Sequence, residues 1–268
     1  MLTTRLTKGI PYAVVDGRTL LLDILHPDPL PEKPMPAVVE VHGGGWYTGD
    51  RDGSRNQFLA ERGFFTASID YRLSQEAIFP AQIHDVKAAI RWVREHAAEY
   101  GIDPDRIGAH GSSAGGHLVA LLGTSGGVPE LEGSVGSQGY SSSVQAVVDL
   151  CGPTDFFETG GKVNEALDDA ESRLLGGPVA DRLELARLAN PITHIRPGMP
   201  AFLIIHSEDD EIVPFIQSVI FERALRDAGQ QARLIGYPDG GHCQEGHWEQ
   251  SMQTMAEFFE ETLAGLGA

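Results

Sequence analysis

The sequence predicts an α/β protein with a mainly parallel central sheet covered by helices on both faces. Short apolar runs alternate with segments of helical periodicity from residue 37 to residue 263, which is typical of repeated strand-helix-strand units. Motifs rich in Gly, His and Asp follow directly after the predicted strands, where open α/β sheets bind ligands. Ahead of this part, two β-rich runs flank Asp16-Gly17, a strong signal for an antiparallel hairpin.

Length and composition limit the organisation and the partners. A chain of 268 residues with 41% hydrophobic content can bury one large core, so we expect a single domain, 1–268, with a small lid or insertion around 153–196. The net charge of -18 disfavours nucleic acid and anionic membranes, and it leaves a small neutral molecule as the expected partner. The N-terminus carries no apolar signal core, which predicts a cytoplasmic protein, or a secreted one if a signal peptide has been removed. The oligomeric state is left open.

The parallel part begins with the apolar run at 37–41, which stops at a Gly-rich stretch. Residues 80–99 carry Ile83, Val86 and Ile90 at helical spacing behind Pro80, which suits a first helical turn. A D-P-D-R turn then leads into the strand at 107–110. The same reasoning predicts further strands at 64–70, 144–150, 201–206 and 232–237, and further helices at 54–62, 118–122, 214–228 and 248–263.

A nucleophile is expected where I-G-A-H-G-S-S-A-G-G-H, residues 107–117, passes from strand to helix. In that context G-x-S-x-G is a nucleophile elbow with Ser113 at its apex. Side chains at Gly111 or Gly115 would collide with the neighbouring strand and helix. Ser112 occupies the variable position of the motif. The alternative is an ordinary Gly/Ser turn, and the following loop, 123–143, is expected to border the site.

A serine nucleophile needs a base, and histidine has the suitable pKa. His242 is preferred among the ten histidines because D-G-G-H-C forms a loop after the last predicted strand, and His247 is its competitor. His117 is expected to serve packing. Histidines at the strand ends are expected to lie in the core and bond to the backbone; these are His42, His110 and His206.

The base needs an acid, and the oxyanion needs donors. H-S-E-D-D-E-I-V-P offers four adjacent carboxylates, Glu208 to Glu211, between serine and histidine; a solvated acidic loop is the alternative. The Gly-rich stretch His42 to Gly45 and the residue Ala114 supply backbone N–H groups. A phosphate cradle is disfavoured because neither a G-x-G-x-x-G motif in the proper unit nor a G-K-[ST] ending is present. This chemistry requires no cofactor and no metal.

With H-G-G-G-W, D-Y-R-L, G-S-S-A-G-G-H, G-P-T-D-F and D-x-x-V-P followed by G-G-H, the chain resembles an α/β-hydrolase carboxylesterase. It is most similar to the compact bacterial feruloyl-esterase-like (BD-FAE-like) group, near the hormone-sensitive-lipase-like esterases, over roughly residues 10–262. The resemblance implies an α/β-hydrolase fold and the following roles: Ser113 nucleophile, Asp210 acid, His242 base, Gly44, Gly45 and Ala114 oxyanion donors, and Trp46 as a substrate-binding residue or a further member of the oxyanion hole.

The expected function is hydrolysis of small or aromatic carboxylic esters through an acyl-enzyme. An arylformamidase or other amide hydrolase could use the same groups, and a ligand-binding receptor on a hydrolase fold is a further alternative. The acyl and alcohol groups of the substrate are not identified. Cys151 and Cys243 are predicted to lie at the same end of the sheet, either bridged or, more in keeping with a cytoplasmic protein, as two reduced thiols.

Overall fold

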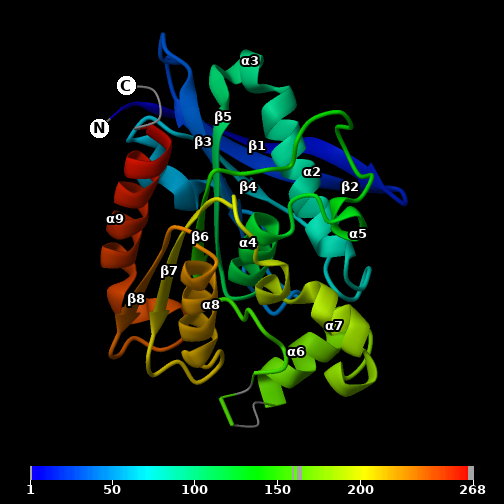
Figure 1. Cartoon of the computed structure of the whole chain (residues 1–268). Coiled ribbons are helices and arrows are strands. Elements are labelled where there is room, and N and C mark those ends of the chain that lie inside the picture. The colour runs from blue at the N-terminus through cyan, green and yellow to red at the C-terminus, as the bar shows by residue number, and fades with distance from the viewer. Residues whose placement is uncertain (1, 159, 162–164, 265–268) are drawn as a thin grey trace.

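The central sheet is mostly parallel, with an antiparallel hairpin at one edge (Figure 1). The computed structural model describes residues 2–158, 160–161 and 165–264. Across the sheet the strands run β1-β2-β4-β3-β5-β6-β7-β8; β1 and β2 are antiparallel, and all pairs from β4 to β8 are parallel. The α/β-hydrolase fold predicted from the sequence is confirmed. The strands are β1 Thr4–Val15, β2 Arg18–Pro27, β3 Met35–Val41, β4 Phe65–Ile69, β5 Ile102–Ser112, β6 Ala146–Leu150, β7 Ala201–Ser207 and β8 Ala232–Tyr237.

Helices connect successive parallel strands, as right-handed strand-helix-strand crossovers require. Within the described residues, no helix combines the length and the apolar character needed to cross a lipid bilayer. The helical elements are η1 Gly53–Asn56, α1 Gln57–Ala60, α2 Ala81–Glu95, α3 Ala97–Tyr100, α4 Ala114–Thr124, α5 Pro129–Glu132, α6 Glu165–Leu175, η2 Val179–Asp181, α7 Leu183–Ala189, η3 Pro191–His194, α8 Ile216–Asp227, η4 His242–His247, α9 Trp248–Phe259 and η5 Glu260–Ala264.

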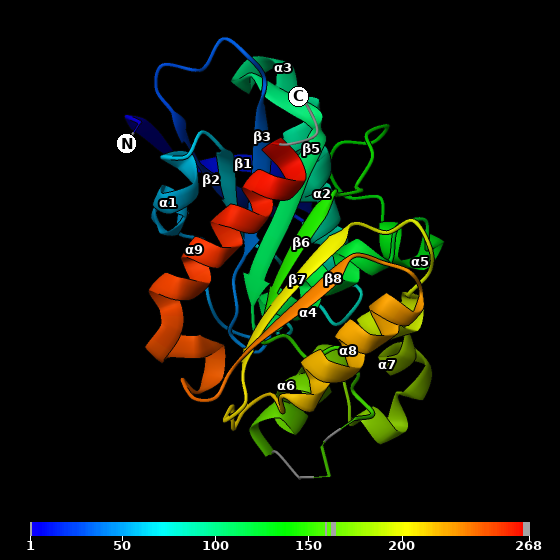
Figure 2. The same cartoon turned by 60° about the vertical axis from the view of Figure 1, so that its left-hand side comes forward.

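The core lies on both faces of the sheet, because alternate residues of a strand point to opposite sides. On β3, Val39 belongs to the buried cluster that includes residues of α2, α4 and α8, whereas its neighbour Val38 belongs to the cluster that includes residues of α1 and α9. Figures 1 and 2 show α9 crossing one face while α2, α4 and α8 cover the other. Burying each such Val or Leu contributes roughly 1.5–3 kcal/mol. This continuous packing fixes the strand ends that carry the candidate site.

The segment between β6 and β7 carries α6 and α7 and lies beyond the carboxyl ends of the strands (Figure 1). Buried amides tie it to the body of the protein: Gln217 of α8 accepts from the backbone N–H of Thr154 at 2.7 Å, and Asn190 accepts from that of Phe156 at 2.9 Å. This is the segment for which the sequence predicts a small lid or insertion. Residues 159 and 162–164 of it lie outside the described part.

Strand β5 is longer than the sequence predicts. The expected D-P-D-R turn, 103–106, is extended chain within β5, where the register against β3 shifts between the pairs Met35–Ile102 and Ala37–Ile107. The extra β5 residues form an irregularity of the kind that lets one strand carry more residues than its partner. The prediction of a turn was wrong because Pro and Asp residues occur in bulges as well as in turns.

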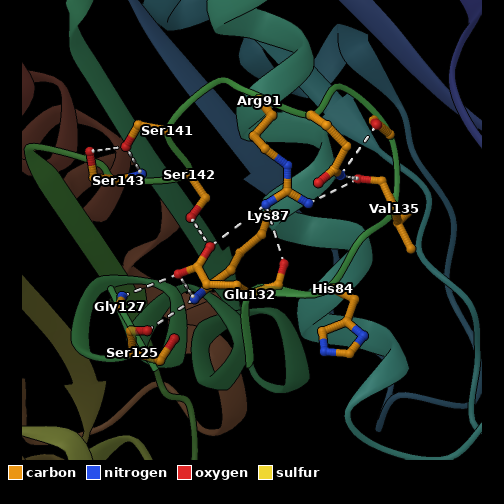
Figure 3. Close-up of polar contacts among 12 residues, drawn as sticks. His84, Lys87, Arg91, Ser125, Gly127, Glu132, Val135, Ser141, Ser142 and Ser143 are labelled. Carbon is orange, nitrogen blue, oxygen red and sulfur yellow. Dashed lines mark hydrogen bonds and ion pairs between the residues drawn. The ribbon is translucent and has the colours of Figure 1, made fainter. Parts of the chain in front are cut away.

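The loop 125–143 does not border the candidate site, contrary to expectation. The 11 residues of α4 carry the chain about 16 Å, back toward the amino ends of the strands. There the loop is held by cations of α2 (Figure 3). Lys87 donates to the carbonyl of Ser125 at 3.0 Å and to Glu132 at 2.8 Å, and Arg91 donates to the carbonyl of Val135 at 2.9 Å.

Candidate active site

Ser113 lies at the turn between β5 and α4 with φ 55° and ψ -120°, a strained conformation for a residue with a side chain. The flanking glycines are needed for close packing. A Cβ atom on Gly115 would lie 2.0 Å from the carbonyl oxygen of Val41 on β3, and one on Gly111 would lie 2.5 Å from the backbone of Gly115. The turn thus presses against the neighbouring strand and lifts the Ser113 hydroxyl above the carboxyl end of the sheet.

His242 reaches Ser113 from the loop after β8. Its Nε2 atom lies 2.9 Å from the Ser113 Oγ atom, so the hydroxyl donates to the ring when the imidazole proton is on Nδ1. The competitor His247 is directed elsewhere: its ring stacks on Tyr237, and its Nε2 lies 2.7 Å from Asp239. His242 is therefore the histidine that the fold places beside the serine.

Asp210 lies in the loop after β7, and its Oδ2 accepts from Nδ1 of His242 at 2.7 Å. The other oxygen accepts from the backbone N–H groups of Ile212 and Val213 at 2.8 and 2.9 Å. The adjacent Asp209 instead accepts from the backbone of Gly241 at 2.9 Å. Of the four carboxylates in this loop, Asp210 is the one that contacts the imidazole.

Electrostatics in this group favour an ion pair. Burial raises the pKa of Asp210, but hydrogen bonds from His206 and His242 outweigh burial and hold that pKa well below its ordinary value. Burial lowers the pKa of His242, but Asp210 and Cys243 outweigh burial, so the pKa of the imidazole is raised. The carboxylate therefore stabilises the positive charge that the imidazole acquires when it takes a proton.

His206 is a member of this group that sequence reasoning missed. It was expected to be a core histidine bonded to backbone, and its Nε2 does lie 3.0 Å from the carbonyl oxygen of Val213. The same nitrogen also lies 3.1 Å from Oδ2 of Asp210, while Nδ1 accepts from the Ser218 hydroxyl at 2.7 Å. The signal in the sequence was its position at a strand end, four residues before the acid.

The Gly-rich turn after β3 lies over the nucleophile. A Cβ atom on Gly43 would lie 3.4 Å from Cβ of Ser113, which measures how closely the two backbones approach. Gly44 and Gly45 adopt φ of 109° and 56°, and both values favour glycine. Ala114 is the first residue of α4, where a backbone N–H has no intrahelical acceptor. The glycines and Ala114 line the same pocket as Ser113.

Trp46 forms part of the wall and is almost fully covered, with 1% exposure. Its indole N–H donates to Nδ1 of His117 at 3.1 Å, and the ring of Phe156 packs against it edge-on. Nε2 of His117 in turn donates to the carbonyl of Ala189. His117 therefore has the packing role expected of it, and the Trp46 ring is held by His117 and Phe156 with almost none of its surface exposed.

A pocket of about 350 Å³ opens in front of Ser113. Its walls come from the Gly-rich turn, the elbow, helix α6 and the loops carrying the acid and the base; from α6 they include Ala166, Leu167 and Ala170. A larger hollow of about 950 Å³ lies near the amino ends of β6, β7 and β8, and Ser113, Asp210 and His242 do not line it. The smaller pocket is the one that the reactive groups face.

Cys151 and Cys243 meet beside the same pocket, with their sulfur atoms 2.9 Å apart. Cys151 follows β6 and is buried, whereas Cys243 follows His242 and lines the pocket. Both are free cysteines in the structure. The two loops thus come together as predicted, without a bond between the two sulfurs.

Strand order, the serine elbow and the ordered serine, acid and histidine define an α/β-hydrolase. A family model described as BD-FAE matches residues 22–225, and the chain belongs to that family. It is 37% identical over 240 residues to Esterase LipQ of Mycobacterium tuberculosis, an alignment that covers 87% of this chain and 55% of the relative. The chain therefore spans about half the length of the curated relatives it matches.

Two solved structures are similar over nearly their whole length. A truncated form of a carbohydrate esterase from gut microbiota shares 35% identity with a TM-score of 0.87, covering 96% of this chain and 95% of that one. Thermogutta terrifontis esterase 2 phosphonylated by sarin shares 30% identity with a TM-score of 0.80, covering 95% of this chain and 94% of that one.

Proposed function

We propose that the chain is a serine carboxylesterase that hydrolyses small or aromatic carboxylic esters through an acyl-enzyme. Ser113 is the nucleophile, His242 the general base and Asp210 the acid that orients it. The observation that carries the proposal is the continuous contact from Ser113 Oγ to His242 Nε2, 2.9 Å, and from His242 Nδ1 to Asp210 Oδ2, 2.7 Å. Both separations lie within the range for proton transfer and for orientation of the base.

In the acylation step, His242 takes the proton of the Ser113 hydroxyl as its oxygen attacks the ester carbonyl. The negative charge that forms on the carbonyl oxygen is stabilised by the backbone N–H groups of Gly44, Gly45 and Ala114. The imidazolium, held by Asp210, then protonates the leaving alcohol, and the acyl group remains on Ser113.

In the deacylation step, water takes the position of the departed alcohol. His242 removes a proton from the water as its oxygen attacks the acyl carbonyl, and the same oxyanion donors stabilise the second tetrahedral intermediate. When this intermediate collapses, His242 returns the proton to Ser113 Oγ and the carboxylic acid is released. No metal and no organic cofactor enters either step of this scheme.

The walls of the pocket support a small or flat acyl group. Helix α6 contributes two small side chains, Ala166 and Ala170, beside Leu167. The volume of about 350 Å³ is at the lower end for ligand sites. In this proposal, residues 153–196 form a partial lid on one domain spanning 1–268, and a neutral ester suits a chain of net charge -18.

The relatives support ester hydrolysis. Esterase LipQ, a carbohydrate esterase and an esterase phosphonylated by sarin are all similar to this chain. An organophosphorus reagent reacts with an activated serine, so the same class of reagent tests the nucleophile here. Incubation with paraoxon followed by peptide mass spectrometry should place the phosphoryl group on Ser113, and modification of another residue would contradict the assignment.

Substrate class is tested with a panel of acetyl, butyryl and feruloyl esters beside an N-formyl aromatic amine. We expect turnover of the esters to exceed that of the formamide. The reverse order would favour an arylformamidase. Absence of turnover of every compound, with Ser113 unreactive toward paraoxon, would favour a ligand-binding receptor on this fold.

A further inference from the structure

Three side-chain atoms that can coordinate a metal ion lie close together beside the nucleophile elbow. The sulfur atoms of Cys151 and Cys243 and a ring nitrogen of His242 all lie within 4.8 Å of one another. They come from two loops, after β6 and after β8, that meet at the carboxyl end of the sheet. His242 and Cys243 line the ester pocket, and the buried Cys151 touches Cys243 at 2.9 Å. An ion that enters the pocket therefore meets His242 and Cys243, and the Cys151 sulfur lies next to that of Cys243.

Two thiols and an imidazole select a particular class of cation. Thiolate and imidazole suit Zn²⁺ and Cd²⁺, whereas Mg²⁺ and Ca²⁺ prefer oxygen ligands. We propose that Cys151, Cys243 and His242 bind one Zn²⁺ or Cd²⁺ ion from the pocket side, and that this ion blocks ester hydrolysis. On binding, each thiol releases its proton to solvent, two metal–sulfur bonds form, and a water completes the coordination.

The required movement is small. With metal–sulfur bonds of about 2.3 Å and a tetrahedral angle, two sulfur ligands lie roughly 3.7 Å apart, compared with 2.9 Å here. The proposal requires the Cys243 side chain, which lines the pocket, to make this movement, because Cys151 is buried. The net charge of -18 further favours accumulation of cations around the protein.

A bound metal ion is incompatible with a working triad, because both ring nitrogens of His242 already form hydrogen bonds within the triad. Nε2 accepts from Ser113, and Nδ1 donates to Asp210. A cation on Nε2 would displace the serine hydroxyl and remove the base. A cation on Nδ1 would break the contact with Asp210 and leave the ring misoriented. Inhibition follows in either geometry.

Binding is measured independently of activity by titrating Cd²⁺ into protein kept reduced with a phosphine, and by following thiolate-to-metal charge-transfer absorption in the ultraviolet. We expect saturation at one Cd²⁺ per chain and no response to Mg²⁺. Cys151→Ser and Cys243→Ser should each weaken binding by on the order of 100-fold, since each removes one of three protein ligands. His247→Gln is the matched control, because that histidine faces Asp239, and it should bind Cd²⁺ as the original chain does.

Inhibition is measured with Zn²⁺, and each variant is compared with its own metal-free rate. The original chain and His247→Gln should lose activity at low Zn²⁺ and regain it with EDTA, whereas the two Cys variants should resist. In the unsubstituted chain, Zn²⁺ should also protect Cys243 from alkylation, a readout that depends neither on folding of a variant nor on the ester being a substrate. Absence of the charge-transfer band, or equal Zn²⁺ sensitivity in the Cys variants, would overturn the proposal.

Discussion

Nε2 of His206 lies 3.1 Å from Oδ2 of Asp210, the same oxygen that contacts Nδ1 of His242 at 2.7 Å. The Asp210 carboxylate is therefore held by two histidines on one oxygen and by two backbone N–H groups on the other. His206 is fully buried and anchored in turn by Ser218. The orientation of the candidate acid is consequently fixed by the end of β7 and by α8, independently of the loop that carries His242.

We predict that His206→Gln lowers kcat by roughly 10- to 100-fold with little change in KM, since a small misplacement of Asp210 carries over to His242. The effect should exceed that of Ser218→Ala, which leaves His206 in contact with both Asp210 and Val213. Steady-state kinetics with an aryl ester measures both constants. An unchanged kcat in His206→Gln would show that the two backbone N–H groups alone are sufficient.

Ser113→Ala should abolish turnover, with a loss on the order of 10⁴-fold or more, because it removes the nucleophile. Ser112→Ala should retain most of the activity, because Ser112 is the last residue of β5, and the hydroxyl that contacts His242 belongs to Ser113, one residue further on. Circular dichroism checks that both variants are folded. Similar rates in the two variants would contradict the placement of the nucleophile.

Asp210→Asn should lower kcat by about 10²- to 10⁴-fold, because an amide favours the wrong imidazole tautomer and cannot stabilise the imidazolium. Asp209→Asn is the matched control one residue away: its side-chain oxygen can still accept from the backbone of Gly241, so we expect nearly full activity. The pair is compared in one assay at equal protein concentration. A larger loss in Asp209→Asn would move the acid by one residue.

The pH dependence follows from the raised pKa of His242. Only the neutral imidazole is a base, so kcat/KM should rise with pH along a limb that lies above the ordinary histidine value of about 6.5. The same raised pKa stabilises the folded state below about pH 6.5, and this contribution is lost as pH rises through the folded pKa. In Asp210→Asn the limb should move to lower pH, whereas Asp209→Asn should keep the original profile; an unmoved limb would show that Asp210 does not raise this pKa.

Glu132→Gln should lower the free energy of unfolding by about 2 kcal/mol, because it leaves the ammonium group of the fully covered Lys87 without its carboxylate. The partly exposed Glu132 side chain keeps the loss below that of a fully buried pair. Urea unfolding measures the change. The double variant Lys87→Met/Glu132→Gln should lose less than the sum of the two single changes. kcat should not change, since this contact lies far from Ser113; a fall in kcat would contradict the separation of the two regions.

Elements whose signal is local could be predicted from the sequence. The hairpin at Asp16-Gly17 is present, and the apolar strands lie within two residues of their predicted bounds, apart from the start of β5. The helix behind Pro80 is also present, but it ends at Glu95, and the separate α3 follows it. The strand order, with β4 between β2 and β3, was not predicted, because it depends on long-range pairing. The loop 125–143 was misplaced because its neighbour in sequence, Ser113, is separated from it by the length of α4.

The residues of the candidate site also divide into those that the sequence predicts and those that it does not. The distances around Ser113, His242 and Asp210 agree with the motif-based assignment of candidates, and their catalytic roles stay predictions until the variants are measured. The contact of His206 with Asp210 could not be read from the sequence, because a core histidine and a positioning histidine have the same pattern of neighbours. The contact between Cys151 and Cys243 depends on two loops 92 residues apart, so the sequence allowed the meeting without fixing its distance.

The clamp formed by Lys87, Arg91 and Glu132 has a practical consequence for handling the protein. It closes the base of the loop 125–143 with charged contacts, while Gln138 to Tyr140 at the tip are exposed. Exposed tips of this kind tolerate insertion, and this one lies at the opposite end of the sheet from Ser113. An affinity tag, a fluorescent reporter or a surface-coupling handle placed at Gly139 would leave the ester pocket facing outward, which makes this loop the natural point for immobilising the protein.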